Sequence, residues 1–337
     1  MRLSSARDAK FELLGELDRV ISVAAPPGEP SVAVGVRPRP AGRFALAVRA
    51  QTAGGPGAQV VADWAERYGD DVDVRVIGMV RKQSIPWYRR RIRPIEPGAS
   101  VSHVDVTAGT IGTFVRRPSV SAQAVELLSN NHVLANENKG AIGDLILQPG
   151  AHDGGTVPDD VIGTLAVFVP IDAEGVNVVD CALCSIDDED GWSLGTFDEE
   201  GGLIGVYDVT AGDDDGDAEL PAVAKFGRTT GRTGGTITAI ELDNVRVQYD
   251  VGVVRFDDQI EVQGTSGPFS QGGDSGSPVI TAAAEASPAG GARAVGLLFA
   301  GSETGGPDGG GLTYVNPITV VLAELDAQLV FSARDAG

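Results

Sequence analysis

Gly273-Asp274-Ser275-Gly276-Ser277-Pro278 is the stretch of this 337-residue sequence that says most about how the chain folds and works. A glycine at 273 lets the backbone bend so that its amide and that of Ser275 can converge on one point. Two such amides are what a nucleophilic serine needs when its reaction places negative charge on a carbonyl oxygen. The stretch therefore nominates Ser275 as a nucleophile and the amides of Gly273 and Ser275 as an oxyanion hole.

A nucleophilic serine needs a base, and the chain offers a short choice. The three histidines are His103, His132 and His152. Only His132 follows an apolar stretch, residues 127–128, and a short polar turn, which would hold an imidazole rigidly at a strand end. Asp180 stands in the apolar run 178–183, where an ionised carboxylate is costly unless a partner hydrogen-bonds to it. We expect Asp180 to orient His132, and His132 to act as the base.

The order His132, Asp180, Ser275 resembles that of the chymotrypsin-like (trypsin-like) serine peptidases, whereas subtilisin-type and α/β-hydrolase enzymes use other chain orders. Segments 227–237 and 296–302 resemble two further strands of that family, and the likeness covers about residues 98–330. It implies an all-β double six-stranded antiparallel barrel with a C-terminal helix. It also implies a serine endopeptidase that acts on protein or peptide substrates through an acyl-enzyme, with no cofactor and no metal.

The resemblance also implies how the nucleophile loop is held. Secreted animal relatives pair the aspartate at the position of Asp274 with a new N-terminus released by cleavage, and nothing here resembles an activation peptide. In bacterial relatives with the motif seen at residues 227–231, the arginine takes this role. We therefore predict an ion pair between Arg228 and Asp274 that keeps the loop formed without processing.

The residues expected to form the substrate pocket carry no acid. Relatives that cleave after Lys or Arg have an acid six residues before the serine, where this chain has Phe269, followed by Ser270. The strand segment Phe299, Ala300 and Gly301 would complete the pocket and leave its entrance open. We expect a small or medium apolar side chain to be accepted at the cleaved bond.

The first 95 residues have a different pattern from the rest of the chain. Apolar residues at helical and alternating spacing predict a small α-β-β-α-β domain over residues 1–95, followed by the barrel domain over 96–337. The basic and aromatic stretch 81–93 at their junction is expected to dock on the acidic barrel rather than on nucleic acid. The small domain could mediate homo-oligomerisation. The barrel strands are expected between short glycine-rich turns, with a last helix over 318–329.

Composition limits the partners and the compartment. The chain has 47 acidic residues and 26 basic residues, which gives a net charge of −21, and only four of the basic residues are lysines. Nucleic acid is therefore not an expected partner, and such acidity is typical of proteins adapted to high salt. No segment predicts a signal peptide or a membrane span. Cys181 and Cys184 are expected to be reduced, since neighbours three apart on one strand point to opposite faces, which favours the cytoplasm.

Two alternatives remain open at this stage. The fold could be a latent or retired protease that serves as a binding or scaffold protein. The motif at residues 130–133 also resembles the histidine motif of HtrA-like quality-control proteases, although Asp274 and the lack of room for a further domain after the barrel argue against that class.

Overall fold

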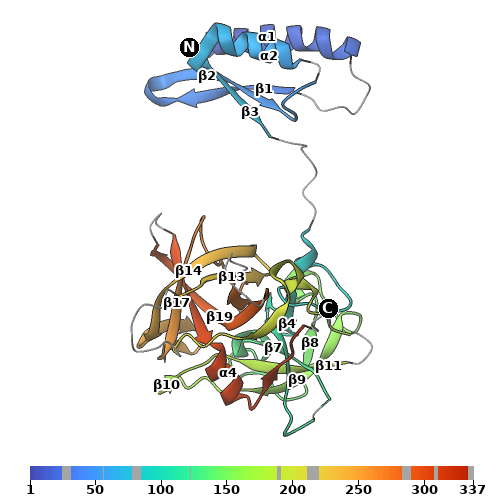
Figure 1. Ribbon diagram of the computed structural model, residues 1–337, viewed down its shortest axis with the longest axis vertical. Helices are drawn as coiled ribbons and strands as arrows, with labels where there is room; N and C mark the ends of the chain where they lie inside the picture. Colours follow the sequence, from blue (N-terminus) through green and yellow to red (C-terminus); the bar gives the residue numbers. More distant parts are fainter. Residues whose placement is uncertain are drawn as a thin grey trace. The chain divides into compact units, whose positions relative to one another are not determined.

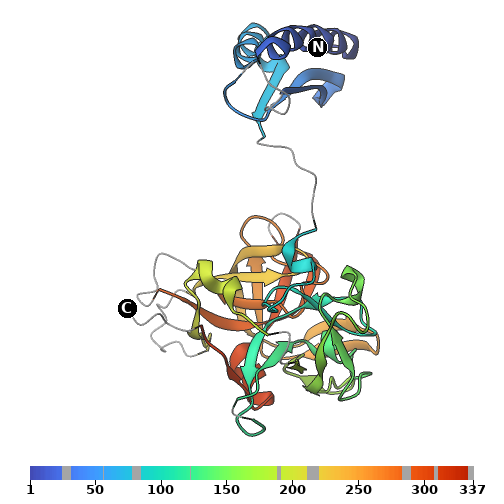
Figure 2. The same ribbon diagram turned by 90° about the vertical axis from the view of Figure 1, so that its right-hand side faces the viewer.

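The computed structural model describes residues 1–24, 32–55, 57–77, 85–121, 123–187, 191–210, 220–282, 290–306 and 310–332. The chain divides into two compact units, Met1–Ser84 and Ile85–Gly337 (Figures 1 and 2). The division falls before the boundary at residue 95 that the sequence suggested. The reason is the basic stretch, whose Arg89 and Arg91 form ion pairs with Asp153 and Asp160 of the second unit. Residues 81–84 of that stretch lie outside the described residues.

The first unit has the α-β-β-α-β order that its pattern predicted. Its elements are α1 (Leu3–Ala24), β1 (Val32–Arg39), β2 (Arg43–Ala50), α2 (Ala58–Tyr68) and β3 (Val72–Val76). Strands β1 and β2 pair antiparallel, and β3 pairs parallel with β2. Leu13 and Leu17 of α1 and Trp64 of α2 are buried with Leu46 and Val48 of the sheet, so both helices cover the same face (Figure 1).

The second unit begins with an eight-stranded antiparallel sheet in the order β21-β6-β7-β11-β9-β8-β4-β5. Its strands are β4 (Ser100–His103), β5 (Gly109–Thr110), β6 (Thr113–Arg116), β7 (Glu126–Ser129), β8 (Leu145–Leu147), β9 (Val161–Phe168), β11 (Ala182–Ile186) and β21 (Gln328–Leu329). Strand β7 is buried along its whole length, and β11 is buried over its first three residues. Among the described residues no pairing closes this sheet on itself.

The other sheet does close. Its strands are β12 (Leu203–Val206), β13 (Ala222–Gly227), β14 (Gly231–Leu242), β17 (Gln259–Gly264), β18 (Pro278–Thr281), β19 (Ala292–Gly305) and β20 (Gly311–Pro317). Because β19 pairs with both β18 and β20, six antiparallel strands form a complete barrel, and β12 adds to β19 in parallel. The predicted double-barrel architecture is confirmed, with the first sheet left as a half-barrel.

Short elements lie between and beside the two sheets. They are η3 (Trp87–Arg89), α3 (Asn131–Leu134), η4 (Ala151–Asp153), β10 (Val176–Asn177), η5 (Gly195–Glu200), β15 (Val245–Tyr249), β16 (Gly252–Phe256) and α4 (Ile318–Glu324). The hairpin β15–β16 pairs through β16 with β10, and it thereby reaches from the closed barrel to the segment before Asp180. The predicted C-terminal helix is present but ends at Glu324, because residues 328–329 pair with β6 instead. No helix in the described parts of the chain has the length and apolar character needed to cross a bilayer.

Candidate active site

His132 lies on the one-turn helix α3, directly after the buried strand β7. Asn130, between the two elements, donates from its side-chain amide to the Asp180 carbonyl oxygen at 2.7 Å, which fixes the point where the chain leaves the sheet. The His132 backbone amide and ring Nδ1 both face the Asp180 carboxylate, at 3.2 Å to Oδ1 and 2.5 Å to Oδ2. The ring is 22% exposed. Its Nδ1 edge is therefore committed to Asp180, which leaves Nε2 to accept a proton.

Asp180 is fully buried just before β11, and a chain of hydrogen bonds fixes its backbone. Its backbone amide donates to Asn316 Oδ1 at 2.9 Å, and Asn316 donates in turn to Gln259 at 2.6 Å. Burial opposes ionisation of both Asp180 and His132. Their attraction and hydrogen bond outweigh it, so the pKa of Asp180 is lowered and the pKa of His132 is raised. The pair is thus held as carboxylate and a readily protonated imidazole.

Tyr249, at the end of β15, is part of this arrangement and was not among the residues predicted from the sequence. Its hydroxyl donates to Asp180 Oδ2 at 2.6 Å, and its ring meets the His132 ring edge-on with centroids 6.0 Å apart. Burial and the neighbouring Asp180 charge raise the pKa of the phenol, so it stays a proton donor. No local pattern marks it, because the contact joins residues 69 positions apart.

Ser275 stands in a tight loop whose glycines have backbone angles that other residues avoid, with φ of 91° at Gly273 and 90° at Gly276. A side chain on Gly273 would lie only 2.5 Å from Arg228 Nη1. The amides of Gln271, Asp274, Gly276 and Ser277 donate within the protein, as the hydrogen bonds Gln271 to Asp274 Oδ2, Asp274 to Gln271, Gly276 to Leu298 and Ser277 to Asp274 show. Within the described residues, the amides of Gly273 and Ser275 have no such acceptor. They are therefore available to a bound oxyanion.

The Ser275 hydroxyl does not bond to His132. It donates to the Phe299 carbonyl oxygen at 3.5 Å, which is a weak contact. Both side chains nevertheless line one cleft of about 880 Å³. Hydrogen bonds between catalytic groups are often long without substrate and tighten when it binds, so the distance does not exclude the pair.

The carboxylate of Asp274 anchors the nucleophile loop, but its cation is not the predicted one. Lys225 Nζ lies 3.2 Å from Asp274 Oδ2, and both side chains are fully buried. The amides of Thr229 and Thr230 donate to Oδ1 at 2.8 and 3.2 Å. Lys225 is one of only four lysines and stands in an apolar strand, which is the signal that the sequence offered.

The predicted ion pair between Arg228 and Asp274 is therefore wrong. Arg228 is 7% exposed and donates to Asp153 through Nε at 2.8 Å and Nη2 at 2.7 Å. This two-bond geometry suits a guanidinium better than a single contact in a turn would. Burial opposes ionisation of Asp153, but Arg228 and Arg89 outweigh it and lower its pKa. Arg228 thus ties the turn after β13 to η4.

The expected pocket residues divide into two groups. Phe299, Ala300 and Gly301 of β19 line the cleft beside Ser275. The assignment of Phe269 to the pocket is wrong, because its ring is fully buried in the core of the closed barrel. Ser270 also lies outside the cleft lining, with its hydroxyl 2.7 Å from that of Thr313.

The lining of the cleft is acidic. It includes four carboxylates and one guanidinium, those of Glu137, Asp243, Glu261, Glu303 and Arg246. Strands β15 and β19 supply most of the cleft lining as a whole. The cleft therefore combines an uncharged strand segment, Phe299–Gly301, with an excess of negative charge in its lining.

The remaining histidines and the cysteines lie outside the cleft lining. His103 is buried, with its Nε2 3.0 Å from Asp144 Oδ2, and His152 is exposed. Cys181 and Cys184 are buried free thiols, and burial raises the pKa of both. Among the described residues, no group of three or more His, Cys, Asp or Glu side chains is arranged to hold a metal ion.

No protein-family model matches the chain, and no curated protein matches it. Solved structures similar to it include Thermobifida fusca protease A, at 20% identity over 71% of this chain and 99% of that one, with a TM-score of 0.45. A glutamic acid specific serine protease matches at 19% identity over 70% and 100%, with a TM-score of 0.45. Cellulomonas bogoriensis chymotrypsin matches at 20% identity over 71% and 100%, with a TM-score of 0.41. These similarities concern the fold alone, and the chemistry of the site rests on its own geometry.

Proposed function

We propose that the chain is a serine endopeptidase that cleaves protein or peptide substrates through an acyl-enzyme. One observation carries the proposal: His132, hydrogen-bonded to the buried Asp180, lines one cleft with Ser275, whose loop offers two amides that have no acceptor among the described residues. These are the nucleophile, base, orienting acid and oxyanion donors that acyl transfer requires.

In this mechanism Ser275 Oγ attacks the scissile carbonyl while His132 Nε2 takes its proton. Asp180 holds the ring and offsets the charge that His132 gains. The amides of Gly273 and Ser275 stabilise the oxyanion, and loss of one such donor typically costs about 3 kcal/mol of transition-state stabilisation. His132 then protonates the leaving amine, and a water repeats the sequence on the acyl-enzyme.

Processing is not needed for this loop to form, in our proposal. The buried contact of Lys225 with Asp274 and the two threonine amides supply what a released N-terminus supplies in activated relatives. Breaking such a buried pair by removing one partner costs about 3–5 kcal/mol, so the loop should be rigid.

For the substrate, we propose an apolar side chain of small or medium size at the cleaved bond and basic side chains farther along. The uncharged segment Phe299–Gly301 next to Ser275 supports the first part. The excess of carboxylates over cations in the cleft lining supports the second, since opposite charges steer and hold a peptide. Replacing Glu261 by Gln should reduce kcat/KM about two- to fivefold for peptides that carry an arginine away from the cleaved bond. It should leave the matching alanine peptides unchanged, as measured on paired fluorogenic substrates.

A latent protease fold is the second candidate, and one observation favours it. The Ser275 hydroxyl donates to the Phe299 carbonyl rather than to His132, so the nucleophile is not engaged by its base.

Incubation with a peptide library, followed by mass spectrometry of the products, separates the two candidates. The proposed enzyme yields internal cleavage at defined sites with the native chain and none with Ser275→Ala. A latent fold gives no difference between the two proteins.

A further inference from the structure

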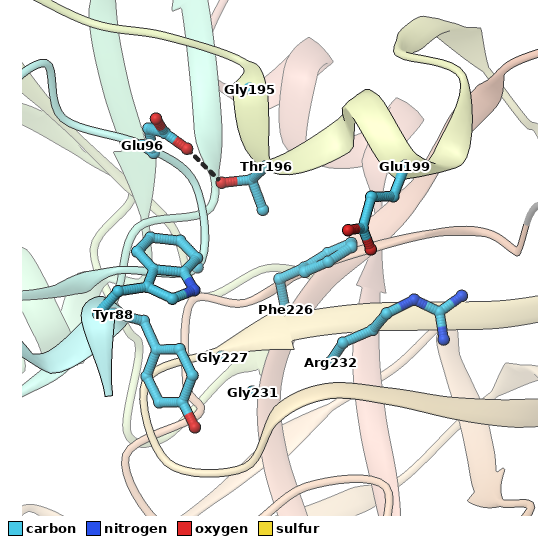
Figure 3. A pocket seen from close by; sticks show the side chains of 11 residues that line it. Tyr88, Glu96, Gly195, Thr196, Glu199, Phe226, Gly227, Gly231 and Arg232 are labelled. Atoms are coloured by element: carbon cyan, nitrogen blue, oxygen red, sulfur yellow. Dashed lines mark hydrogen bonds between the residues drawn. The ribbon is translucent and has the colours of Figure 1, made fainter. Parts of the chain in front are cut away.

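A second pocket, of about 320 Å³, shares no lining residue with the cleft that holds Ser275. Three separate segments build it: η3 with the residues that follow it, the ends of β13 and β14, and η5 (Figure 3). All of them belong to the second unit. The volume is in the range of small-ligand sites in proteins. We call it the aromatic pocket.

Aromatic rings form much of its wall. Trp87 and Tyr88 meet edge-on with centroids 5.7 Å apart, and Phe226 lines the pocket from β13. Phe226 is supported from behind by the buried Phe197, with centroids 5.8 Å apart. Trp87 is 43% exposed although it lies beside this surface. The pocket thus keeps large ring surfaces open to solvent, where they are costly unless a ligand covers them.

Two carboxylates stand among these rings. The carboxylate of Glu199 points toward Phe226, and Glu96 accepts a hydrogen bond from Thr196 at 3.0 Å (Figure 3). Neither forms an ion pair with a cation of the described residues. Arg232 also lines the pocket, but its guanidinium is bound to Glu200 at 2.5 Å. The pocket therefore has two uncompensated negative charges.

Arg89 and Arg91 of the basic stretch are engaged by carboxylates outside the pocket lining, and Arg90 donates from Nε to the Ile85 carbonyl oxygen. Arg89 is paired with Asp153 at 2.7 Å and Arg91 with Asp160 at 3.2 Å. The two carboxylates would repel an anionic ligand, and a neutral aromatic ligand would leave both of them without a cation partner. A delocalised or alkylated cation uses the ring faces and the carboxylates together.

We propose that the aromatic pocket binds a guanidinium or alkylammonium group, either of a free amine or of an arginine or lysine side chain. The group would lie against Trp87, Tyr88 and Phe226 and donate hydrogen bonds to Glu199 and Glu96. This inference does not depend on the proposed peptidase activity.

The position of the pocket gives such binding a route to the candidate active site. Gly227 and Gly231 line the pocket, and the turn between them carries the two threonine amides that hold Asp274. Phe226 faces the pocket, whereas its neighbour Lys225 reaches Asp274, as alternating strand side chains do. A bound cation would thus touch the backbone that holds the nucleophile loop.

Binding is tested on the full chain carrying Ser275→Ala, so that no probe can be cleaved. Agmatine and the blocked tripeptide acetyl-Gly-Arg-Gly-amide are titrated by calorimetry, and by tryptophan fluorescence as a report on Trp87. We expect both to bind, and Glu199→Gln to weaken binding about fivefold. The matched control Asp198→Asn removes the same charge from the same short helix, outside the pocket lining, and should leave binding unchanged. Trp87→Phe should abolish the fluorescence response.

The relative affinity of the two probes identifies the source: equal affinity indicates a free amine, and tighter tripeptide binding indicates a polypeptide side chain. Circular dichroism checks the fold of each variant, and Glu96→Gln replaces Glu199→Gln if that variant unfolds. Three results would overturn the proposal: no binding of either probe, equal binding of the citrulline tripeptide, or a loss caused by Glu303→Gln in the cleft and not by the pocket variants.

Discussion

Replacing Tyr249 by Phe tests whether the Tyr249 hydroxyl contributes to the contact between His132 and Asp180. The substitution keeps the ring, with its contacts to His132 and Phe256, and removes only the hydroxyl that donates to Asp180 Oδ2 at 2.6 Å. A buried hydrogen bond to a charged group contributes about 1.5–3 kcal/mol, so we expect the free energy of unfolding to fall by about 2 kcal/mol.

The same change should alter the pH dependence of activity. The Tyr249 hydrogen bond lowers the pKa of Asp180. Without it the carboxylate becomes more basic and attracts the proton on His132 more strongly, so the pKa of His132 rises. The acid limb of the kcat/KM profile should then move to higher pH. At a pH above the acid limbs of both the native chain and the variant, kcat/KM should change little.

Urea unfolding and pH–rate profiles of the native and variant chains measure both effects. Tyr314→Phe is the matched control, because Tyr314 lines the same cleft without contacting Asp180. It should leave the acid limb in place. An acid limb that stays fixed or moves to lower pH in Tyr249→Phe, with unfolding unchanged, would refute the reasoning.

Three further predictions concern the loop around Ser275 and the contact of Asp180 with His132. Lys225→Met should lower the free energy of unfolding by about 3–5 kcal/mol and abolish cleavage, because it leaves the buried Asp274 without its cation; a stable, active variant in urea unfolding and peptide assays would contradict this. Gly273→Ala should reduce kcat at least about 100-fold with little change in KM, because a side chain there collides with the neighbouring guanidinium and strains a backbone with φ of 91°. Asp180→Asn should reduce kcat about 10⁴-fold and lower the pKa of His132, which the carboxylate raises in the native chain above the ordinary value of 6.5. Its acid limb should therefore move to lower pH, and NMR titration of the ring gives an independent measure.

The parts of this protein that the sequence predicted best are those with a local signal. The α-β-β-α-β order and the barrel strands follow from apolar spacing, and Ser275 with its flanking glycines is marked by one short stretch. The structure brings His132 and Asp180 into contact, and Ser275 into the same cleft. Each of these three residues lies within a few positions of a strand end, so the pattern of the neighbouring residues is enough to predict where it stands in the fold.

The errors and omissions concern choices between distant partners. The sequence predicts that Arg228 pairs with Asp274. In the structure Arg228 donates two hydrogen bonds to Asp153, 75 positions away, and Lys225 is the cation beside the buried Asp274. Phe269 is predicted to line the pocket because it stands six positions before Ser275 in the sequence. In the structure its ring is buried in the barrel core, where removing a large apolar side chain from water stabilises the fold. Tyr249 depends on how one hairpin docks, which no local pattern reveals.

Labelling with a fluorophosphonate, followed by mass spectrometry of the full chain, tests the central claim most directly. If Ser275 is a nucleophile activated by His132 and Asp180, one adduct forms on Ser275. Its rate falls as His132 is protonated, and Ser275→Ala takes up no label. A folded chain that forms no adduct between about pH 6 and 9 at any salt concentration, or that reacts equally at another residue, would contradict it.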